Sequence, residues 1–183
     1  EPERQGETVG TQTSYVLPLA FGIVPDSVHG KFVDNLAHAV TSGGEGHEPY
    51  SLLTGFIGTA WISRVLSDVG LPDMAYSLLL NTSFPSWLYP VTQGATTVWE
   101  RLDSYTHSRG FGGNNRMNSF NHYSFGAVGH WLMSRSLGIE PMKEYPGFAS
   151  FELRPQPAPA GMMDYATGHY DSPYGRIESS WKR

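Results

Sequence analysis

Cysteine is absent from the 183 residues of this chain, and charged residues are scarce. The lack of cysteine excludes disulfide bonds, thiolate metal sites and cysteine nucleophiles. Charged residues make up only 16% of the chain, the net charge is −5, and no basic stripe is present. Proteins that bind nucleic acid or anionic membranes usually show the opposite charge pattern. We therefore expect no nucleic acid and no membrane as a partner.

Long apolar runs are also absent. No uninterrupted stretch approaches the roughly 20 residues of a membrane-spanning helix, and the opening segment EPERQGETVG lacks the apolar core of a signal peptide. We expect a soluble chain, and the sequence leaves its compartment open. The seven histidines include no His-x-x-x-His pair, so we expect no metal site and no cofactor.

Aromatic residues (13%) and 21 glycines are what the chain has in abundance. An aromatic-rich, charge-poor composition suits a protein that stacks flat rings on neutral ligands such as sugars, and it also suits the interior of a large protein. The aromatic side chains gather in and directly after the irregular stretch 83–117, which ordinary core packing does not require. They are Trp87, Tyr89, Trp99, Tyr105, Phe111 and Phe120.

Apolar residues at helical spacing predict helices over residues 11–24, 26–40, 58–69, 72–82 and 119–137. Thr11 or Thr13 could cap the first helix, and Pro18 would kink it. Only Gly70 and its neighbours separate the third helix from the fourth, which opens at Pro72. This short connection predicts an antiparallel helical hairpin.

Beyond Pro141 the sequence pattern changes from helical spacing to period two. Residues 148–153 alternate in polarity, and two further strands are predicted with a turn at Asp171–Gly175. A β module this small cannot bury a face of its own. We therefore expect a mainly α chain, with a helical domain over residues 1–140 and a truncated β domain over 141–183, that is a piece of a longer protein.

Glu100 is the first residue that could carry chemistry. It lies beside Trp99 in QGATTVWERLD, after a run of uncharged residues. A carboxylate in this setting could lie in an aromatic cleft. The alternative is a surface glutamate that pairs with Arg101 or Arg64, and spacing alone favours this alternative.

His122, in NSFNHYSFGAVGHW, is the second candidate. The segment predicts the start of a helix, with Asn118 or Ser119 as the N-cap and with Tyr123 on the same face as Ala127 and Trp131. A histidine near a helix N-terminus could orient a ligand hydroxyl or a neighbouring carboxylate. The alternative is a half-buried histidine that binds a carbonyl group.

Three segments together resemble the C-terminal half of the catalytic domain of bacterial-type α-L-rhamnosidases, glycoside hydrolase family seventy-eight. In order, they are TGFIGTAWISRVLSDVGLPDMAYSLLL, PSWLYPVTQGATTVWERLDSY and NSFNHYSFGAVGHWLMSRSLGIEP. The ending, YPGFASFELRPQP and then YDSPYGRIESSWKR, resembles the start of the β-domain that follows in these enzymes. The likeness covers nearly all of residues 10–183.

The resemblance implies half of an (α/α)6 toroid followed by a short, incomplete antiparallel β module, from an enzyme that releases terminal α-L-rhamnose with inversion. It implies that Glu100 is the general base and that His122 lines the rhamnose pocket, with Trp99 and Trp87 in the pocket wall. Nothing in the chain matches the segment that carries the family's general acid. We therefore expect the isolated chain to be inactive. A rhamnose-containing carbohydrate is the expected substrate, and the missing N-terminal half of the catalytic domain is the expected partner.

Two other functions stay open on the residues alone. One is a non-catalytic carbohydrate-binding or scaffold module, in which sugar binding would survive the substitution Glu100→Gln. The other is a different α/α-toroid enzyme, such as a polysaccharide lyase, which would release an unsaturated sugar. The sequence does not specify the aglycone, the linkage or the oligomeric state.

Overall fold

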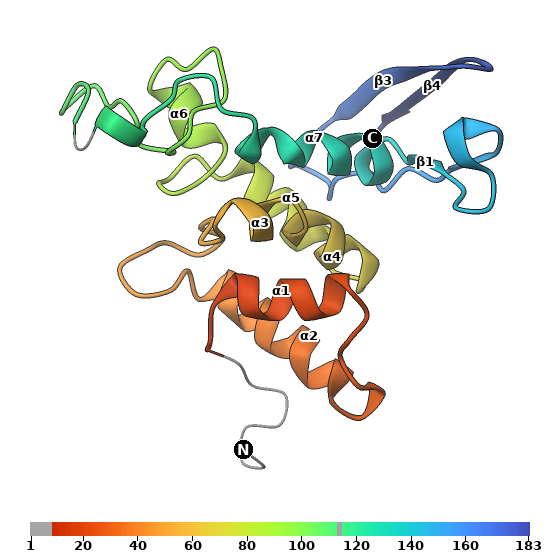
Figure 1. The fold of residues 1–183 in the computed structure, drawn as a ribbon, viewed down its shortest axis with the longest axis horizontal. Helices are drawn as coiled ribbons and strands as arrows, with labels where there is room; N and C mark the ends of the chain where they lie inside the picture. Colours follow the sequence, from red (N-terminus) through yellow and green to blue (C-terminus); the bar gives the residue numbers. More distant parts are fainter. Residues whose placement is uncertain (1–8, 113–114) are drawn as a thin grey trace. The chain divides into compact units, whose positions relative to one another are not determined.

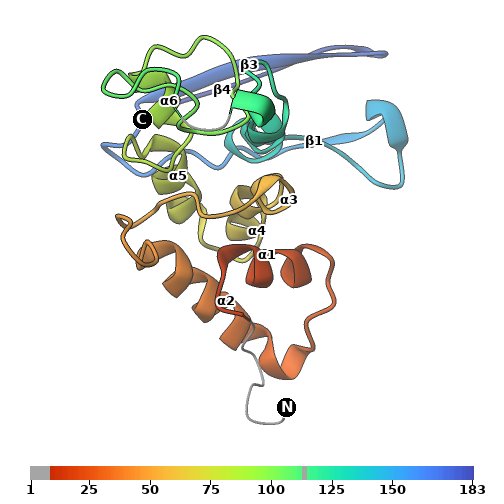
Figure 2. The same cartoon turned by 60° about the vertical axis from the view of Figure 1, so that its left-hand side comes forward.

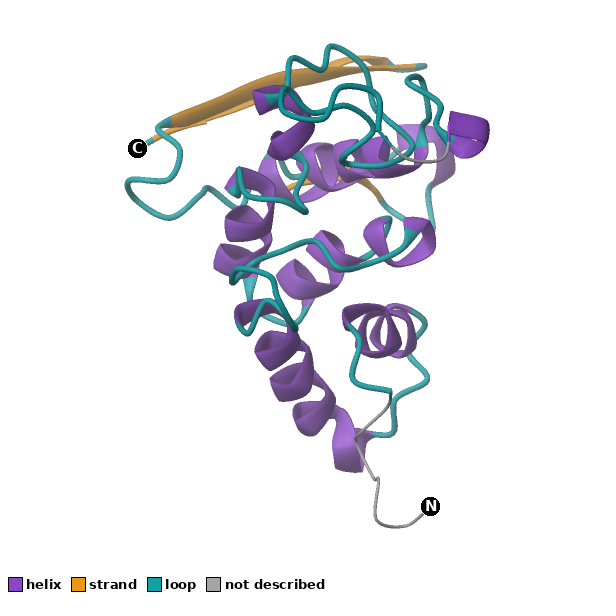
Figure 3. Ribbon diagram, turned by 90° about the vertical axis from the view of Figure 1, so that its left-hand side faces the viewer, coloured by secondary structure: helices purple, strands orange, loops and turns teal. Residues whose placement is uncertain are grey.

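The computed structural model describes residues 9–112 and 115–183 of the chain (Figures 1 and 3). The chain divides into two compact units, Glu1–Ala127 and Val128–Arg183. The helical elements of the first unit are α1 (Gln12–Ala20), α2 (Asp26–Thr41), α3 (Phe56–Thr59), α4 (Ile62–Asp68), α5 (Pro72–Leu80), α6 (Leu88–Thr92), and the 3₁₀ turns η2 (Asn115–Met117) and η3 (Ser124–Ala127). The second unit contains α7 (Val128–Trp131), the π-helical turn η4 (Leu132–Ser136), β1 (Ile139–Pro141), the 3₁₀ turn η5 (Pro146–Phe148), β2 (Phe151–Leu153), β3 (Tyr165–Ser172) and β4 (Gly175–Lys182).

Helices α1 and α2 pack against each other and form the first helical pair (Figure 1). Thr11 caps α1, as predicted: its hydroxyl oxygen accepts a hydrogen bond from the Ser14 amide at 3.2 Å, and the Ser14 hydroxyl oxygen accepts one from the Thr11 amide. Helix α1 ends earlier than predicted, at Ala20. In α2, over the predicted range 26–40, apolar residues at helical spacing face the core, with Leu36 and Val40 fully buried.

Helices α4 and α5 form the predicted hairpin around Gly70 and Pro72. Gly70 adopts a φ of 86°, a conformation that favours glycine, and the Leu71 amide donates to the Leu66 carbonyl at 2.7 Å to close α4. The prediction of one helix over 58–69 is wrong, because α3 and α4 are separate helices. The hairpin contributes most of the fully buried apolar side chains of the unit, among them Ile62, Leu66, Ala75, Tyr76 and Leu78.

The predicted helix over 119–137 starts later than the sequence indicated. Its first turn is η3, which begins at Ser124, and the residues before it are not helical. The predicted N-cap at Asn118 or Ser119 is therefore wrong. Tyr123, expected on the buried face, is 85% exposed. The physical reason is that backbone amides of this segment donate to a neighbouring segment of the chain instead of entering a helix.

Two antiparallel strand pairs follow in the second unit. Strand β1, which was not predicted, pairs with β2, and β3 pairs with β4 in the long ribbon of Figure 2. The turn between β3 and β4 confirms the prediction at Asp171–Gly175. The predicted strand 148–153 is shorter in the structure, because Phe148 has a φ of 65° and belongs to η5.

A small apolar cluster stabilises the second unit. It contains Leu137, Ile139 and Ile177, with Met133, Phe148 and Ala166 packed against them. Two side chains of β4 bind the end of η4, since the Ser179 hydroxyl donates to the Leu137 carbonyl at 2.6 Å and the Trp181 indole donates to the Ser136 carbonyl at 2.9 Å. Strand β4 is thereby tied to the helical turn that precedes β1.

Candidate active site

Two irregular segments of the first unit, 97–100 and 119–122, run side by side and carry three of the four predicted site residues, Trp99, Glu100 and His122. The Glu100 amide donates to the Ser119 carbonyl at 2.8 Å, and the His122 amide donates to the Val98 carbonyl at 2.8 Å. The Thr97 hydroxyl also donates to the Phe120 carbonyl. These bonds bring Glu100 and His122, separated by 21 residues of sequence, onto adjacent segments of the chain.

The Glu100 carboxylate is held in place by the facing segment. Its Oε2 accepts a hydrogen bond from the Ser119 amide at 2.7 Å, so Glu100 and Ser119 are joined by two bonds. A hydrogen bond to an ionised acceptor is stronger than one between neutral groups. The carboxylate has about four lone-pair sites, and this bond uses one of them. The half-buried side chain therefore keeps acceptor capacity for a water molecule or a sugar hydroxyl.

The arginines that the sequence offered as partners for Glu100 bind elsewhere. The Arg64 guanidinium lies 3.7 Å from the Asp68 carboxylate. The Arg101 guanidinium donates to the Gly112 carbonyl at 3.4 Å. The carboxylate of Glu100 is instead oriented by a backbone amide, which sequence spacing does not reveal.

His122 lies between aromatic rings, just before η3. Its imidazole stacks on Phe56, with ring centroids 4.8 Å apart, and on Tyr123, at 5.5 Å. Nδ1 of His122 accepts a long hydrogen bond from the Ser124 amide at 3.4 Å. In the neutral imidazole the proton then resides on Nε2, which becomes the donor that could bind a ligand hydroxyl.

The two predicted tryptophans lie in different surroundings. Trp99 is buried and packs edge-on against Phe120 at 5.2 Å. Trp87 is half-buried, and its indole N–H donates to the Phe125 carbonyl at 2.9 Å. The Phe125 ring contacts Phe56 at 5.4 Å, so the Trp87 indole binds the backbone of a residue whose ring packs on the Phe56 ring that stacks on His122.

A hollow of about 300 Å³ lies on the Trp99 side of the paired segments. Its lining is neutral and partly aromatic, and consists of Gln93, Gly94, Ala95, Thr96, Thr97, Trp99, Tyr105, Phe111 and Phe120. Within the described part of the chain, Trp99 is the one predicted site residue that lines this hollow; Glu100, His122 and Trp87 do not.

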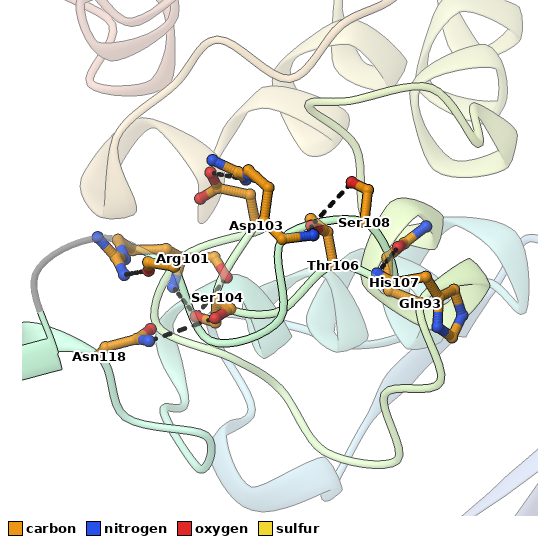
Figure 4. A network of polar contacts seen from close by, with 10 residues as sticks. Gln93, Arg101, Asp103, Ser104, Thr106, His107, Ser108 and Asn118 are labelled. Atoms are coloured by element: carbon orange, nitrogen blue, oxygen red, sulfur yellow. Dashed lines mark hydrogen bonds and ion pairs between the residues drawn. The ribbon is translucent and has the colours of Figure 1, made fainter.

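A network of polar contacts supports the segment that follows Glu100 (Figure 4). The fully buried Ser104 hydroxyl donates to the Arg101 carbonyl at 2.8 Å and accepts from the Arg101 amide at 3.3 Å. The Asn118 side-chain amide donates to the Ser104 carbonyl at 3.4 Å. Asn118 directly precedes Ser119, and Ser104 lies four residues after Glu100. This network therefore adds a contact between residues that flank the two segments.

Sequence reasoning missed three contributors to this site. The Ser119 amide and the Ser104 hydroxyl act through backbone geometry, which residue type alone does not indicate. Phe56 lies far from His122 in sequence, and only the fold brings their rings together. Among the residues that the structure describes, no group of three or more histidines, aspartates or glutamates could hold a metal ion. Over the same residues, no helix has the length and apolar character needed to cross a membrane.

Comparisons with known proteins match the whole course of the chain. The model of the bacterial alpha-L-rhamnosidase 6 hairpin glycosidase domain matches residues 3–135, and that of the bacterial alpha-L-rhamnosidase C-terminal domain matches residues 138–183. An alpha-L-rhamnosidase of Formosa agariphila is 38% identical over 176 residues, which is 96% of this chain and 18% of that protein. One of Streptomyces avermitilis is 38% identical over 173 residues, which is 94% of this chain and 16% of that protein.

Solved structures give the same result. The Streptomyces avermitilis alpha-L-rhamnosidase complexed with L-rhamnose superposes with a TM-score of 0.85 at 37% identity, covering 95% of this chain and 16% of that one. The native enzyme from Aspergillus terreus gives a TM-score of 0.87 at 33% identity, covering 97% of this chain and 20% of that one. The chain thus spans less than a quarter of these relatives. The match confirms the predicted fold class, part of a six-hairpin toroid followed by a short antiparallel β module.

Proposed function

Because this chain belongs to the bacterial α-L-rhamnosidase family, we propose that it supplies the water-activating side of an active site that hydrolyses terminal α-L-rhamnose. The observation that carries this proposal is the carboxylate of Glu100, held by the Ser119 amide at 2.7 Å on a segment paired with that of His122. Glu100 is the general base, and His122 binds the sugar.

An inverting glycosidase requires two carboxyl groups roughly 6.5–9.5 Å apart, one of which donates a proton to the leaving oxygen while the other activates water. Glu100 takes the second role. The bond from Ser119 fixes one carboxylate oxygen, so the other can accept the proton of the attacking water in a defined direction. A preset orientation lowers the entropy that must be lost in the transition state.

The aromatic group around His122 supports its role in binding the sugar. Stacking on Phe56 and Tyr123 restricts the imidazole plane, and the Nε2 proton then points in a defined direction toward a sugar hydroxyl. Trp87 is proposed as part of the same wall through Phe125, and Trp99 as the wall on the side of the hollow. Hydrogen bonds of this kind accelerate the reaction when they strengthen as charge develops on the sugar ring.

The general acid is proposed to lie in the part of the toroid outside this chain, because the chain covers only 16–18% of the two rhamnosidases from Formosa agariphila and Streptomyces avermitilis. The isolated chain is accordingly expected not to hydrolyse p-nitrophenyl α-L-rhamnoside. Turnover by the purified chain would contradict this division of the site. The domain boundary after residue 140 stays a prediction from the sequence.

The test is a chimera in which residues 10–183 replace the matching part of the Streptomyces avermitilis relative. We expect it to hydrolyse p-nitrophenyl α-L-rhamnoside and to release β-L-rhamnose first, as NMR of the fresh product would show. Glu100→Gln should lower kcat by about 10²–10⁴, because the amide cannot accept the proton of water. Glu144→Gln, the same change at an exposed glutamate of the second unit, is the matched control.

Two outcomes would contradict the assignment. A kcat of the Glu100→Gln chimera within tenfold of the parent chimera would exclude Glu100 as the general base. Release of α-L-rhamnose as the first product would exclude the inverting reaction. If the chimera binds rhamnose without any hydrolysis, and Glu100→Gln leaves that binding unchanged, the chain acts as a carbohydrate-binding module instead.

A further inference from the structure

The neutral hollow beside Trp99 is not needed to explain the roles of Glu100 and His122. Its volume of about 300 Å³ is at the lower end of the range for small-molecule pockets, about 300–1,000 Å³. Its lining carries no carboxylate, ammonium or guanidinium group. An uncharged ligand is the one that such a lining can desolvate without leaving an unpaired charge.

One wall of the hollow is a continuous row of aromatic rings. Trp99 contacts Phe120 at 5.2 Å, Phe120 contacts Phe111 at 5.4 Å, and Phe111 contacts Tyr105 at 5.1 Å. Aromatic pairs at these separations stabilise one another. The rest of the lining includes the polar side chains of Gln93, Thr96 and Thr97.

Phe111 is the exposed member of this row. Its side chain is 66% exposed, although both of its neighbours are bound: the Gly110 amide donates to the Thr106 carbonyl at 2.7 Å, and the Gly112 carbonyl accepts from Arg101 at 3.4 Å. The backbone thus holds an apolar ring that stays largely exposed to solvent despite its contacts with Tyr105 and Phe120. A ring held in this way is a preformed platform for a ligand.

One polar side chain of the lining, that of Gln93, is hydrogen-bonded to the loop that carries two of the rings. The Gln93 side-chain oxygen accepts a hydrogen bond from the His107 amide at 2.9 Å (Figure 4). This bond ties the stretch that precedes Trp99 to the loop that carries Tyr105 and Phe111. In the absence of a ligand the hollow therefore already has an aromatic part of touching rings and a polar part with a hydrogen-bonded side chain.

We propose that the hollow is a subsite for a neutral ring with an apolar face, either a sugar ring or a flat aromatic group. Trp99 lines it and directly precedes Glu100, and Phe120 directly follows the Ser119 amide that holds the Glu100 carboxylate. Glu100 itself does not line the hollow, so binding of the ring does not depend on the proposed function of Glu100 as general base.

The test uses the chain as it is, labelled with ¹⁵N and titrated with methyl β-D-glucopyranoside and, separately, with 4-nitrobenzyl alcohol. The shifts of the Gly94, Gly110 and Gly112 amides report binding. Phe111→Ala should raise Kd about three- to tenfold, because one stacked ring contributes roughly 0.5–1.5 kcal/mol. Phe111→Tyr should restore the parent Kd, and Tyr174→Ala, which removes an exposed ring of the second unit, should leave it unchanged.

The two probes distinguish the sources of the ring. A Phe111-dependent Kd for the glucoside alone identifies a sugar ring as the ligand. A Phe111-dependent Kd for the alcohol alone identifies a flat aromatic group, and either result supports the subsite. Absence of binding for both probes, or equal effects of Phe111→Ala and Tyr174→Ala, overturns it. Tighter binding of glucuronate than of the neutral glucoside also overturns it, because the hollow then selects charge. Phe111→Leu, which keeps apolar volume without a ring, repeats the test if the alanine variant loses its far-UV circular dichroism.

The variant Glu100→Gln separates this inference from the proposed function. It should leave the Kd of both probes unchanged, since Glu100 does not line the hollow. If the probes bind while the Glu100→Gln chimera keeps its activity, the proposed function fails and the ring subsite stands. If Glu100→Gln abolishes the activity of the chimera while Phe111→Ala leaves the Kd of both probes unchanged, the proposed function stands and only the subsite fails.

Discussion

The α4–α5 hairpin and the paired segments 97–100 and 119–122 belong to the same unit, but different forces hold them. The hairpin buries aliphatic and aromatic side chains, with Leu66 and Tyr76 fully inaccessible. The paired segments are joined by backbone amides, by the carboxylate of Glu100 and by the hydroxyl of Thr97. Burial of apolar area is non-directional, whereas hydrogen bonds fix distance and angle.

This difference explains where the candidate chemistry lies. A helical hairpin can exchange one apolar side chain for another with modest loss, because volume is what it must conserve. A general base needs a defined direction for its carboxylate, which the Ser119 amide provides and an apolar contact does not. The helices supply stability, and the irregular segments supply orientation.

The largest effect is expected in the hairpin core. Leu66→Ala should lower the free energy of unfolding by about 2–5 kcal/mol, because it removes a fully buried side chain and leaves a cavity. Urea unfolding followed by circular dichroism measures the loss. The matched control, Leu153→Ala at a side chain that is 52% exposed, should change stability by less than about 0.5 kcal/mol. A loss below 1 kcal/mol for Leu66→Ala would mean that the hairpin core is not the main source of stability.

A smaller and more local effect is expected at Ser104. Ser104→Ala leaves the part-buried Arg101 amide without its hydroxyl partner, at a cost of about 1–3 kcal/mol. The Arg101 carbonyl keeps its bond from the Ser104 backbone amide at 3.1 Å. The loss should appear as faster hydrogen exchange at the amides of Glu100 and Arg101, while the α4–α5 amides stay protected. The exposed Ser42→Ala is the control. Equal acceleration of hydrogen exchange at Glu100–Arg101 and in the α4–α5 hairpin would show that the two regions unfold as one cooperative unit.

The cap of α1 is the next test. Thr11→Ala removes the hydroxyl that accepts from the Ser14 amide, and it should cost about 1 kcal/mol. The midpoint of urea unfolding should fall slightly, with an unchanged slope. Thr82→Ala, at an exposed threonine outside the helices, should leave the midpoint as it is. An identical midpoint for both variants would exclude the capping box as a stabilising feature.

The smallest effect is expected in the exposed β3–β4 ribbon. The pKa of Asp171 is lowered chiefly by hydrogen bonds from the Arg176 guanidinium, at 2.7 and 3.1 Å. Because the pKa of Asp171 is lowered in the folded state, the ion pair stabilises the folded state at pH values above the ordinary pKa of 3.8. This contribution to stability is lost as the pH falls through the folded-state pKa. Arg176→Gln should therefore raise the Asp171 titration midpoint, as carboxyl NMR would show. An unchanged midpoint would mean that the ion pair does not form in solution.

Sequence patterns predicted helix α2 and the α4–α5 hairpin well and the candidate site less completely. The stripe that ends at Leu36 and Val40, and the break at Gly70–Pro72, follow from local rules of spacing, capping and backbone conformation. The start of the helix after Tyr123 could not be predicted in the same way. Ser119 is a good N-cap residue by type, but its amide binds the carboxylate of Glu100, which lies 19 positions earlier in the chain.

The sequence by itself determined the family, the mainly helical class with its short β module, and the residue types that can carry glycoside hydrolysis. These depend on composition, periodicity and contiguous motifs, all of which are local. Only the tertiary structure decided that Glu100 is oriented by Ser119, that His122 stacks on Phe56, and that a neutral aromatic hollow opens beside Trp99. Such contacts join residues 19 to 66 positions apart, and their geometry depends on how the intervening chain folds back.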